Sequence, residues 1–402
     1  MKNSNKIKRI ALVLTTAIII AGCKATTEDH PNPVIPATSE NIANIIKNLQ
    51  GEGPHKITVT GTITNENIDS IKNELKANSN AKVSLNMSAT TNLATLPADA
   101  FESCTSLTEI ALPSSLTTID ERAFSNCKSL KKIILPSNLK IINGYAFSEC
   151  SSLEEIILSS SINKIDEGAF NGCKSLKSIN IPASVNYLDP TAFSGCSSLK
   201  TLTVEEENTK FSSRENIIYT KGQDLLLCAA GGITSANILS SVTEIGEAAF
   251  KDCTSLKEVD IPNSVTVIQN LAFYGCSALE SVTIPAAVNS LQQSVFKDCT
   301  SLKEVAIPNS VVSIENLAFS GCSALESVTI PAAVDSLENK VFDGCTSLKS
   351  FAFAKTNSWY RTDNSDDWTN RMNGQFYPVT NPAVNATYFN VKGQNSYWYR
   401  KD

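Results

Sequence analysis

Cysteine is the residue type whose number and spacing in this chain most directly suggest chemistry. The chain contains 12 cysteines, and ten of them form two groups of five in which every step has the same length, as from Cys104 to Cys127. One group runs from Cys104 to Cys196 and the other from Cys253 to Cys345. Thiols spaced in this way could form disulfides, bind a metal ion or pack as small apolar side chains.

The regular step favours burial over the other two uses of these ten thiols. If the repeated units stack on one another, equivalent Cα atoms lie about 5 Å apart, within reach of a disulfide. Their side chains project in parallel, however, so the Cβ atoms do not face one another. The sequence has no C-x-x-C pair, and its two histidines, His30 and His55, precede all ten positions. We therefore expect a ladder of buried free thiols that holds no metal.

Carboxylates are the other abundant group capable of chemistry. The chain has 40 Asp and Glu residues, so many pairs of the glycosidase type are conceivable. The short motifs of lipases, P-loop ATPases, zinc proteases and dinucleotide-binding enzymes are missing from the sequence. Asp363, Asp366 and Asp367 lack the spacing of an EF-hand calcium loop. The sequence therefore predicts no enzyme, no cofactor and no metal site, and a hydrolase remains as an alternative.

A repeated sequence unit must position the cysteines. Each unit has a Phe three residues before its Cys and a Leu three residues after it, as in Phe101-Cys104-Leu107. Apolar residues at alternate positions follow the Leu, and many units then have Pro, which ends strand pairing. The Ala-Phe segment that precedes Cys in most units suits one short helical turn. A unit this short cannot bury its own apolar side. The chain is thus expected to be an α/β solenoid of about eleven coils with a parallel β-sheet, spanning residues 97–353.

One step in the repeat is longer than the others. The interval from Cys196 to Cys253 equals two coil steps plus an insertion of eleven further positions. Two apolar stretches, Asn216–Thr220 and Asp224–Cys228, flank a Lys-Gly turn in this interval. Two such stretches around a short turn are typical of a β-hairpin. We therefore expect a hairpin insertion at about residues 205–232.

The segments on either side of the repeats are expected to close the ends of the solenoid. In residues 38–96, apolar residues at helical spacing follow Thr38-Ser39 and again Thr64, and strands are expected at 57–60 and 82–86. This segment is predicted to be a small N-terminal α/β cap. Residues 354–402 contain all three Trp and form an aromatic, β-rich C-terminal cap.

The C-terminal aromatic residues have two possible roles. Residues 358–361 and 397–400 have similar aromatic sequences, which suggests paired strands that cover the open edge of the sheet. The same side chains could instead bind a partner. The candidate residues are Trp359, Tyr360, Trp368, Tyr397, Trp398 and Tyr399.

The first residues of the chain read as a targeting signal. A basic stretch, Lys2 to Arg9, precedes an apolar run from Ile10 to Ile20 that is too short to span a membrane. The following Ala-Gly-Cys resembles the lipobox of bacterial lipoproteins. That resemblance implies a signal peptide over residues 1–22, lipid attachment at Cys23 and a lipidated tether over 23–37. The alternative is an ordinary signal peptide.

Outward positions of the predicted sheet are candidates for binding a partner. Charges alternate in sign from coil to coil, and an apolar pair stands at Ile134 and Ile157. Opposite charges on neighbouring strands also stabilise a sheet, which explains the alternation without any ligand. The candidate residues are Lys131, Lys132, Ile134, Glu154, Glu155, Ile157, Lys257, Glu258, Glu280, Lys303, Glu304 and Glu326.

The net charge argues against one class of partner. The formal charge is −6, and without Lys2, Lys6, Lys8 and Arg9 the chain has 30 basic against 40 acidic residues. Nucleic-acid binding depends on basic residues that contact phosphates. We therefore expect no nucleic-acid partner.

The repeat unit resembles a known family. The pattern A-F-x-x-C-x-x-L-x-x-I-x-I-P, held over about residues 101–353, is similar to the BspA-like leucine-rich repeat of bacterial surface proteins. With the lipobox and the two caps, the chain resembles spirochaetal leucine-rich repeat lipoproteins. The resemblance implies an adhesin anchored in the outer membrane by the lipid on Cys23 and displayed at the cell surface. Its implied partners are host extracellular-matrix or cell-surface proteins, or neighbouring bacteria. A scaffold or assembly factor that faces the periplasm is the alternative.

Overall fold

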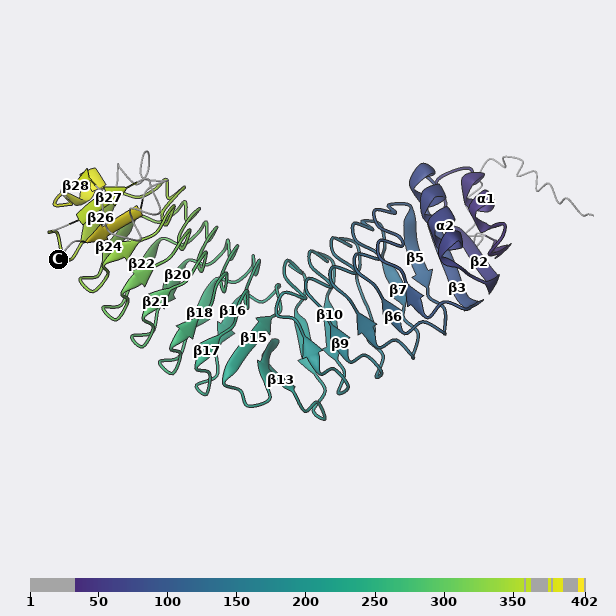
Figure 1. Cartoon of the computed structure of the whole chain (residues 1–402), viewed down its shortest axis with the longest axis horizontal. Coiled ribbons are helices and arrows are strands. Elements are labelled where there is room, and N and C mark those ends of the chain that lie inside the picture. Colours follow the sequence, from purple (N-terminus) through teal and green to yellow (C-terminus); the bar gives the residue numbers. More distant parts are fainter. Residues whose placement is uncertain (1–32, 358, 363–374, 377–378, 386–396, 401–402) are drawn as a thin grey trace, which may run out of the picture. The chain divides into compact units, whose positions relative to one another are not determined.

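The computed structural model of the protein describes residues 33–357, 359–362, 375–376, 379–385 and 397–400. The predicted signal peptide, Cys23, most of the predicted tether and Trp368 lie outside these residues. Figure 1 shows short coils that follow one another in chain order, with two helices near the N-terminal end.

Nearly every coil contributes a short strand to a series of parallel strands, here called stack 1; the coil of Glu155 joins it through an isolated bridge to Lys132, and pairing is interrupted between residues 204 and 235. Backbone hydrogen bonds continue from coil to coil, as from Glu154 N to Lys131 O and from Lys177 N to Glu154 O. The strands of stack 1 are β1 (Ile35–Thr38), β2 (His55–Thr62), β3 (Val83–Thr91), β5 (Leu107–Ala111), β7 (Lys132–Ile134), β10 (Ser178–Ile181), β12 (Thr201–Val204), β16 (Ser235–Asn237), β18 (Glu258–Asp260), β20 (Ser281–Thr283), β22 (Glu304–Ala306), β24 (Ser327–Ile330) and β26 (Ser350–Phe353).

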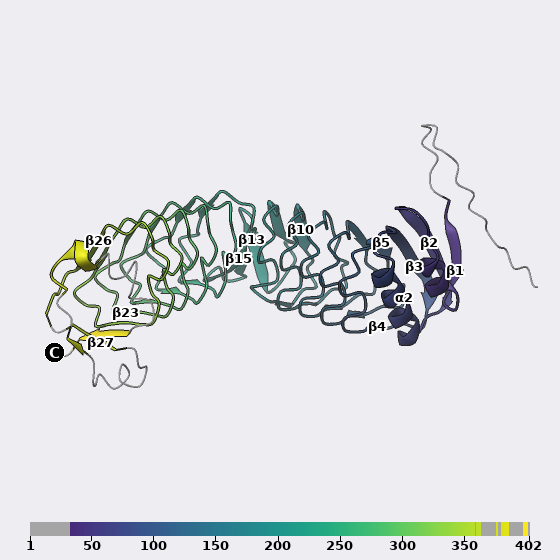
Figure 2. The same cartoon turned by 90° about the horizontal axis from the view of Figure 1, so that it is seen from above.

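Most coils add a second, two-residue strand to another parallel array, here called stack 2. Its strands are β4 (Thr95–Leu96), β6 (Thr118–Ile119), β8 (Ile141–Ile142), β9 (Lys164–Ile165), β11 (Tyr187–Leu188), β17 (Glu244–Ile245), β19 (Val267–Ile268), β21 (Ser290–Leu291), β23 (Ser313–Ile314) and β25 (Ser336–Leu337). The view in Figure 2, from above, shows the two arrays along the same series of coils.

The solenoid has about fourteen turns rather than the expected eleven. The difference arises at the N-terminal end, where β1, β2 and β3 pair in parallel with one another and β3 pairs with β5. The cap therefore extends stack 1 by three strands. β1 also includes residues 35–37, which the sequence assigned to the end of the tether.

The helices of the N-terminal cap form where the apolar spacing predicts them. α1 covers Ile42–Lys47 and α2 covers Asn65–Ala77. Thr64 caps α2, because its side chain accepts a hydrogen bond from Asn67 N while the Asn67 side chain accepts one from Thr64 N. One face of α2, made by Ile68, Ile71 and Leu75, is buried.

The Ala-Phe-x-x-Cys segment was expected to form a helical turn, and the structure corrects this. Cys127 N donates to Phe124 O, three residues earlier, in a tight turn. Arg122 and Asn126 have φ angles of 53° and 60°, which a right-handed helix does not contain. The neighbouring Phe124 N instead donates to Ala146 O of the next coil at 2.7 Å. The turns are thus bonded to adjacent coils rather than coiled into a helix.

Stacked phenylalanines fill the core behind these turns. The Phe124 and Phe147 ring centroids are 5.3 Å apart with an interplanar angle of 4°, and Phe147 and Phe170 are also 5.3 Å apart. One series runs from Phe101 to Phe193 and the other from Phe250 to Phe342. The two series are separated in sequence by the insertion.

The insertion contains the expected hairpin and one strand more. β14 (Ile217–Thr220) and β15 (Leu225–Ala229) are antiparallel, and β13 (Phe211–Arg214) pairs with β14 on its other side. β15 then pairs in parallel with β17, so the hairpin supplies a strand of stack 2. The buried Asn208 side chain donates to Pro182 O and Val185 O, which holds the start of the insertion against the preceding coil.

The C-terminal aromatic segments pair as predicted. β27 (Trp359–Thr362) and β29 (Tyr397–Arg400) are antiparallel, and β28 (Gln375–Phe376) pairs with β27. β29 also pairs with β25, the last strand of stack 2. It therefore covers an edge that would otherwise present unpaired backbone groups.

Candidate functional site

The outer surface of stack 1 has three rows of side chains that cross the strands. The first row is Lys131, Glu154, Lys177, Lys200, Lys257, Glu280, Lys303, Glu326 and Lys349, all exposed. The second includes Glu109, Lys132, Glu155, Ser178, Thr201, Glu258, Ser281, Glu304 and Ser327. The third includes Ala111, Ile134, Ile157, Asn180, Thr203, Thr283, Ala306 and Thr329. These rows form because side chains alternate between the two faces of a strand.

Ion pairs link several coils along the first row. The Nζ–Oε2 distance is 3.0 Å for Lys177 and Glu154 and 3.2 Å for Lys303 and Glu280. Lys349 and Glu326 make a third pair at 3.0 Å. The hydrogen bond from Lys177 lowers the pKa of the Glu154 carboxyl. These exposed pairs add little to stability and set opposite charges on adjacent strands, whereas Lys177 and Lys200 are neighbours of the same sign in this row.

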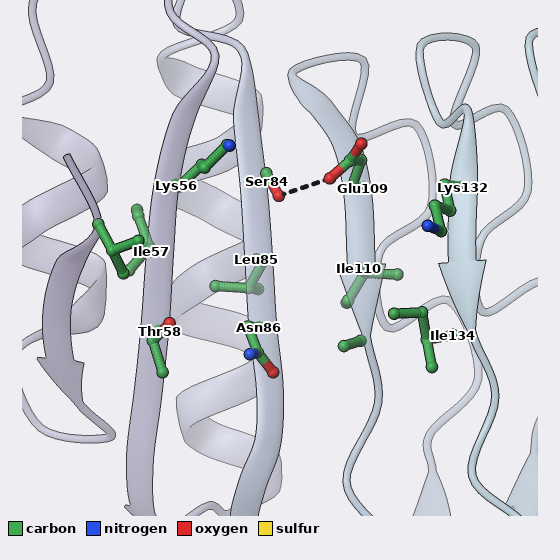
Figure 3. Close-up of a pocket in the computed structure, with 12 residues that line it drawn as sticks. Lys56, Ile57, Thr58, Ser84, Leu85, Asn86, Glu109, Ile110, Lys132 and Ile134 are labelled. Carbon is green, nitrogen blue, oxygen red and sulfur yellow. Dashed lines mark hydrogen bonds between the residues drawn. The ribbon is translucent and has the colours of Figure 1, made fainter. Parts of the chain in front are cut away.

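A hollow of about 280 Å³ lies on this face at the N-terminal end, over β2, β3, β5 and β7. Figure 3 shows Lys132 and Ile134 on one strand, with Glu109 on the next and Ser84 beyond it. The Ser84 hydroxyl donates to Glu109 Oε2 at 3.0 Å. The hollow thus has charged groups on one side and the apolar Ile134 on the other.

A second hollow, of about 640 Å³, lies over β20, β22 and β24. Four hydroxyl side chains line it: Ser281, Thr283, Ser327 and Thr329. Ala306 lies between the two threonines in the third row, and Glu304 lies between the two serines in the second. The surface offers donors and acceptors side by side rather than a set that converges on one atom. Such a surface suits a broad contact more than a small ligand.

All twelve sheet residues singled out from the sequence are exposed on this face. They fall into two groups, one from Lys131 to Ile157 and the other from Lys257 to Glu326. The sequence missed the contributions of Lys56, Ser84 and Glu109 to the first hollow. The intervals from Ile57 to Leu85 and from Leu85 to Ile110 are both longer than the repeat step, so the signal that could have found them is the alternation of apolar and polar residues within each strand.

The cysteine ladder is buried, as the spacing predicts. All eleven cysteines from Cys104 to Cys345 are free and buried. Burial raises the pKa of the Cys104, Cys196 and Cys345 thiols to about 12. A thiol that stays protonated is a poor nucleophile and a poor metal ligand. Among the residues that the structure describes, no group of three or more His, Cys, Asp or Glu could hold a metal ion.

Three of the six C-terminal aromatic candidates pack inside the cap. Trp359 and Trp398 are each 1% exposed, and Tyr399 is also buried. The Phe353 ring centroid lies 4.7 Å from that of Trp359. These three side chains therefore contribute to the cap's interior rather than to a binding patch, because a ligand cannot reach them. Tyr360 and Tyr397 are half-buried, and Trp368 lies outside the described residues.

Family membership follows from the repeats. The model of the BspA type leucine-rich repeat region, present in six copies, matches residues 94–216 and 227–358. The chain belongs to the BspA-type leucine-rich repeat family. Leucine-rich repeat proteins generally bind other proteins, and solenoids of this family are generally non-enzymatic scaffolds. Membership therefore indicates a role in protein–protein interaction.

Three solved structures show the same fold as this BspA-type protein. A leucine-rich cell surface protein from Faecalibacterium prausnitzii has 24% identity and a TM-score of 0.59, and the match covers 86% of this chain and 92% of the other. A leucine-rich repeat protein from Eubacterium ventriosum has 20% identity and a TM-score of 0.52, with coverage of 76% and 92%. The pneumococcal vaccine antigen PcpA has 22% identity and a TM-score of 0.52, with coverage of 79% and 72%.

No curated protein matches the chain. Within the described part of the BspA-type protein, no helix combines the length and apolar character needed to cross a membrane.

Proposed function

We propose that this BspA-type protein is an adhesin, held to the outer membrane by a lipid on Cys23 and displayed at the cell surface. It binds host extracellular-matrix or cell-surface proteins, or neighbouring bacteria, through the outer face of stack 1. The observation that carries the proposal is the hollow of about 640 Å³ over β20, β22 and β24, lined by hydroxyl groups in two parallel rows.

The side chains on this face suit a protein partner. Ser281 and Ser327 in the second row, and Thr283 and Thr329 in the third, are hydroxyls that can donate or accept hydrogen bonds. Neighbouring parallel strands lie about 4.8 Å apart, so the rows present hydrogen-bonding groups at regular intervals. Lys303 and Glu326 place both signs of charge beside them. A polypeptide laid across the strands meets polar groups along its whole length.

The anchor rests on the sequence. Ala-Gly-Cys23 after an apolar run is what a lipidated chain requires, and several acyl chains on one residue hold a protein durably. The description of the Faecalibacterium prausnitzii protein as a cell surface protein supports display, although at 24% identity the likeness itself concerns the fold. The proposal includes no catalytic step.

Display is tested by treating intact cells with protease and detecting the C-terminal segment with an antibody. The proposal predicts loss of the signal while a periplasmic control protein stays intact. A signal that survives on intact cells and disappears after lysis would contradict surface display and favour the periplasmic scaffold.

Binding is tested with two variants in the same coil. Thr283→Arg places a long cation in the second hollow, whereas Asn289→Arg adds the same side chain at an exposed position before β21, on stack 2. Cells that produce each variant are applied to immobilised matrix proteins. The proposal predicts at least tenfold weaker attachment for Thr283→Arg and unchanged attachment for Asn289→Arg. Equal attachment by both variants would place the binding surface elsewhere.

A further inference from the structure

The outer face of stack 1 has an exposed apolar pair near its N-terminal end. Ile134 is 55% exposed and Ile157 is 75% exposed. The bridge between Lys132 and Glu155 sets the register of these coils, so the two isoleucines are neighbours in the third row. Two large apolar side chains side by side in solvent favour contact with another apolar surface.

The charges next to this pair are opposite on the two coils. Lys131 and Lys132 precede Ile134, whereas Glu154 and Glu155 precede Ile157 at the same positions. Glu154 is bonded to Lys177. Lys132 and Glu155 are exposed, and neither forms an ion pair with another residue that the structure describes. Their charges are therefore available to a partner.

A two-fold rotation matches this pattern to itself. Consider an axis parallel to the strands that passes between the coil of Lys132 and the coil of Glu155. A two-fold rotation about this axis generates a second copy that faces the first. The coil of Glu155 in the second copy lies opposite the coil of Lys132 in the first, and residues at the same position along the strand face each other. Lys132 of one copy then faces Glu155 of the other, and Lys131 likewise faces Glu154. Ile134 of one copy faces Ile157 of the other, so the surface is complementary to itself, as a two-fold interface requires.

The flanking coils agree with the same axis. The rotation places Glu109 opposite Ser178 and Ala111 opposite Asn180. One coil further out, Ser84 meets Thr201. These pairs contain no two charges of the same sign, and like charges that face each other would cost free energy at a desolvated contact.

Other placements of the axis fit less well. An axis between the coils of Glu154 and Lys177 pairs those charges but sets Ile157 against Asn180. An axis between the coils of Glu280 and Lys303 pairs opposite charges without any large apolar residue. A two-fold axis that runs across the strands, midway between the second and third rows, reverses the direction along each strand. Lys132 of one copy would then face Ile134 of the other. Of these four axes, only the one between the coils of Lys132 and Glu155 brings apolar residues together and pairs opposite charges at the same time.

We propose that this surface, made by Lys131, Lys132, Ile134, Glu154, Glu155 and Ile157, binds a second copy of the chain across a two-fold axis. The inference does not rest on the adhesin role, because it concerns the N-terminal part of stack 1 and leaves the hollow over β20, β22 and β24 free. Charge pairing at the contact predicts a dimer that weakens as salt concentration rises.

Sedimentation across a concentration series tests the dimer. The sample is residues 24–402, which include every residue that the structure describes. The proposal predicts a mass that rises from one chain toward two. Lys132→Glu sets Glu against Glu155 of the other copy and is expected to weaken association at least tenfold, and Ile157→Ser is expected to do the same. Circular dichroism verifies that these exposed substitutions preserve the fold.

A charge swap tests the axis itself. The double variant Lys132→Glu with Glu155→Lys restores opposite charges across the axis and is expected to restore association. The matched control, Lys303→Glu with Glu326→Lys, exchanges an alternating pair far from the contact and leaves association unchanged. A wild-type chain that is monomeric throughout, a dimer unaffected by Lys132→Glu, or a double variant as weak as the single one would each overturn the proposal.

Discussion

The thiol of Cys127 donates a hydrogen bond to the carbonyl oxygen of Phe101, in the preceding coil, with an Sγ–O distance of 2.9 Å. The same relation joins Cys150 to Phe124 at 3.1 Å and Cys345 to Phe319 at 3.2 Å. The Phe101 carbonyl oxygen also accepts from Cys104 N, so the thiol adds a second hydrogen bond to it from the next coil, and a thiol is small enough to fit between coils. The cysteine therefore supports the stacking of coils and has no free reactivity.

Thiol accessibility provides the first prediction. A thiol reagent at neutral pH should modify none of the eleven cysteines from Cys104 to Cys345 in the folded protein, because all are buried. After unfolding in denaturant, all eleven should react. Rapid modification of the ladder in the folded state, counted by mass spectrometry on digested peptides, would contradict the buried arrangement.

Alkaline pH should lower the stability of the folded protein. Burial raises the pKa of Cys104, Cys196 and Cys345 from 9.0 to about 12, so the folded state holds these protons more tightly than the unfolded state does. The corresponding stability is fully present below pH 9.0 and is lost as pH rises toward about 12. Urea midpoints should therefore fall between pH 9 and pH 11. A variant with Ala at all three positions should show a smaller fall relative to its own midpoint at pH 8.

Removing a phenylalanine from inside a stack should cost more than removing one at its end. Phe147 is stacked on Phe124 and Phe170, both at 5.3 Å, whereas Phe193 stacks on Phe170 at 5.6 Å and ends the first series. Phe147→Ala should lower the free energy of unfolding by about 3–5 kcal/mol, because a cavity remains in a packed core. Phe193→Ala should cost less. Urea denaturation of both variants provides the measurement, and equal losses would argue against stacking as the cause.

The N-cap of α2 should make a measurable contribution. Thr64→Ala removes the hydroxyl that accepts from Asn67 N and should cost about 1 kcal/mol of stability. Thr62→Ala, at an exposed position two residues earlier in β2, serves as the control. Thermal denaturation should give Thr64→Ala a lower melting temperature than Thr62→Ala. A lower melting temperature for Thr62→Ala would contradict the prediction.

The C-terminal cap should protect the last strand of stack 2. Trp398 is 1% exposed and lies opposite Leu337 in the pairing of β29 with β25. Trp398→Ala should loosen β29 and increase amide hydrogen exchange at Ser336 and Leu337, because their edge becomes accessible to water. Exchange in β6, far along the chain, should stay unchanged. Unaltered exchange in β25 would show that the cap is not needed there.

The repeat period predicted the coils, the parallel strands and the buried cysteines because these features depend on local spacing. Phe101, Cys104 and Leu107 recur at fixed offsets, and a residue that recurs in this way must occupy equivalent places in a stack. The hairpin was also predictable, since its two apolar stretches surround a short turn.

Features that depend on contacts outside the period were not predicted. Ile57 and Leu85 join stack 1, but the interval between them is longer than one repeat and they have no Phe or Cys beside them. The polar sequence of β13, Phe211–Arg214, gave no strand signal, and its pairing with β14 forms it. Burial of Trp359 and Trp398 depends on how the cap folds against the last coils, which spacing does not specify.

The central claim is that partners bind on the outer face of stack 1, and site-specific photo-crosslinking tests it most directly. A photoreactive amino acid replaces Thr283 in the second hollow or Asn289 on stack 2, and cells that produce each protein are illuminated with purified matrix proteins. The account predicts crosslinked products from position 283 and none from position 289. Crosslinks from position 289 with none from position 283 would contradict it.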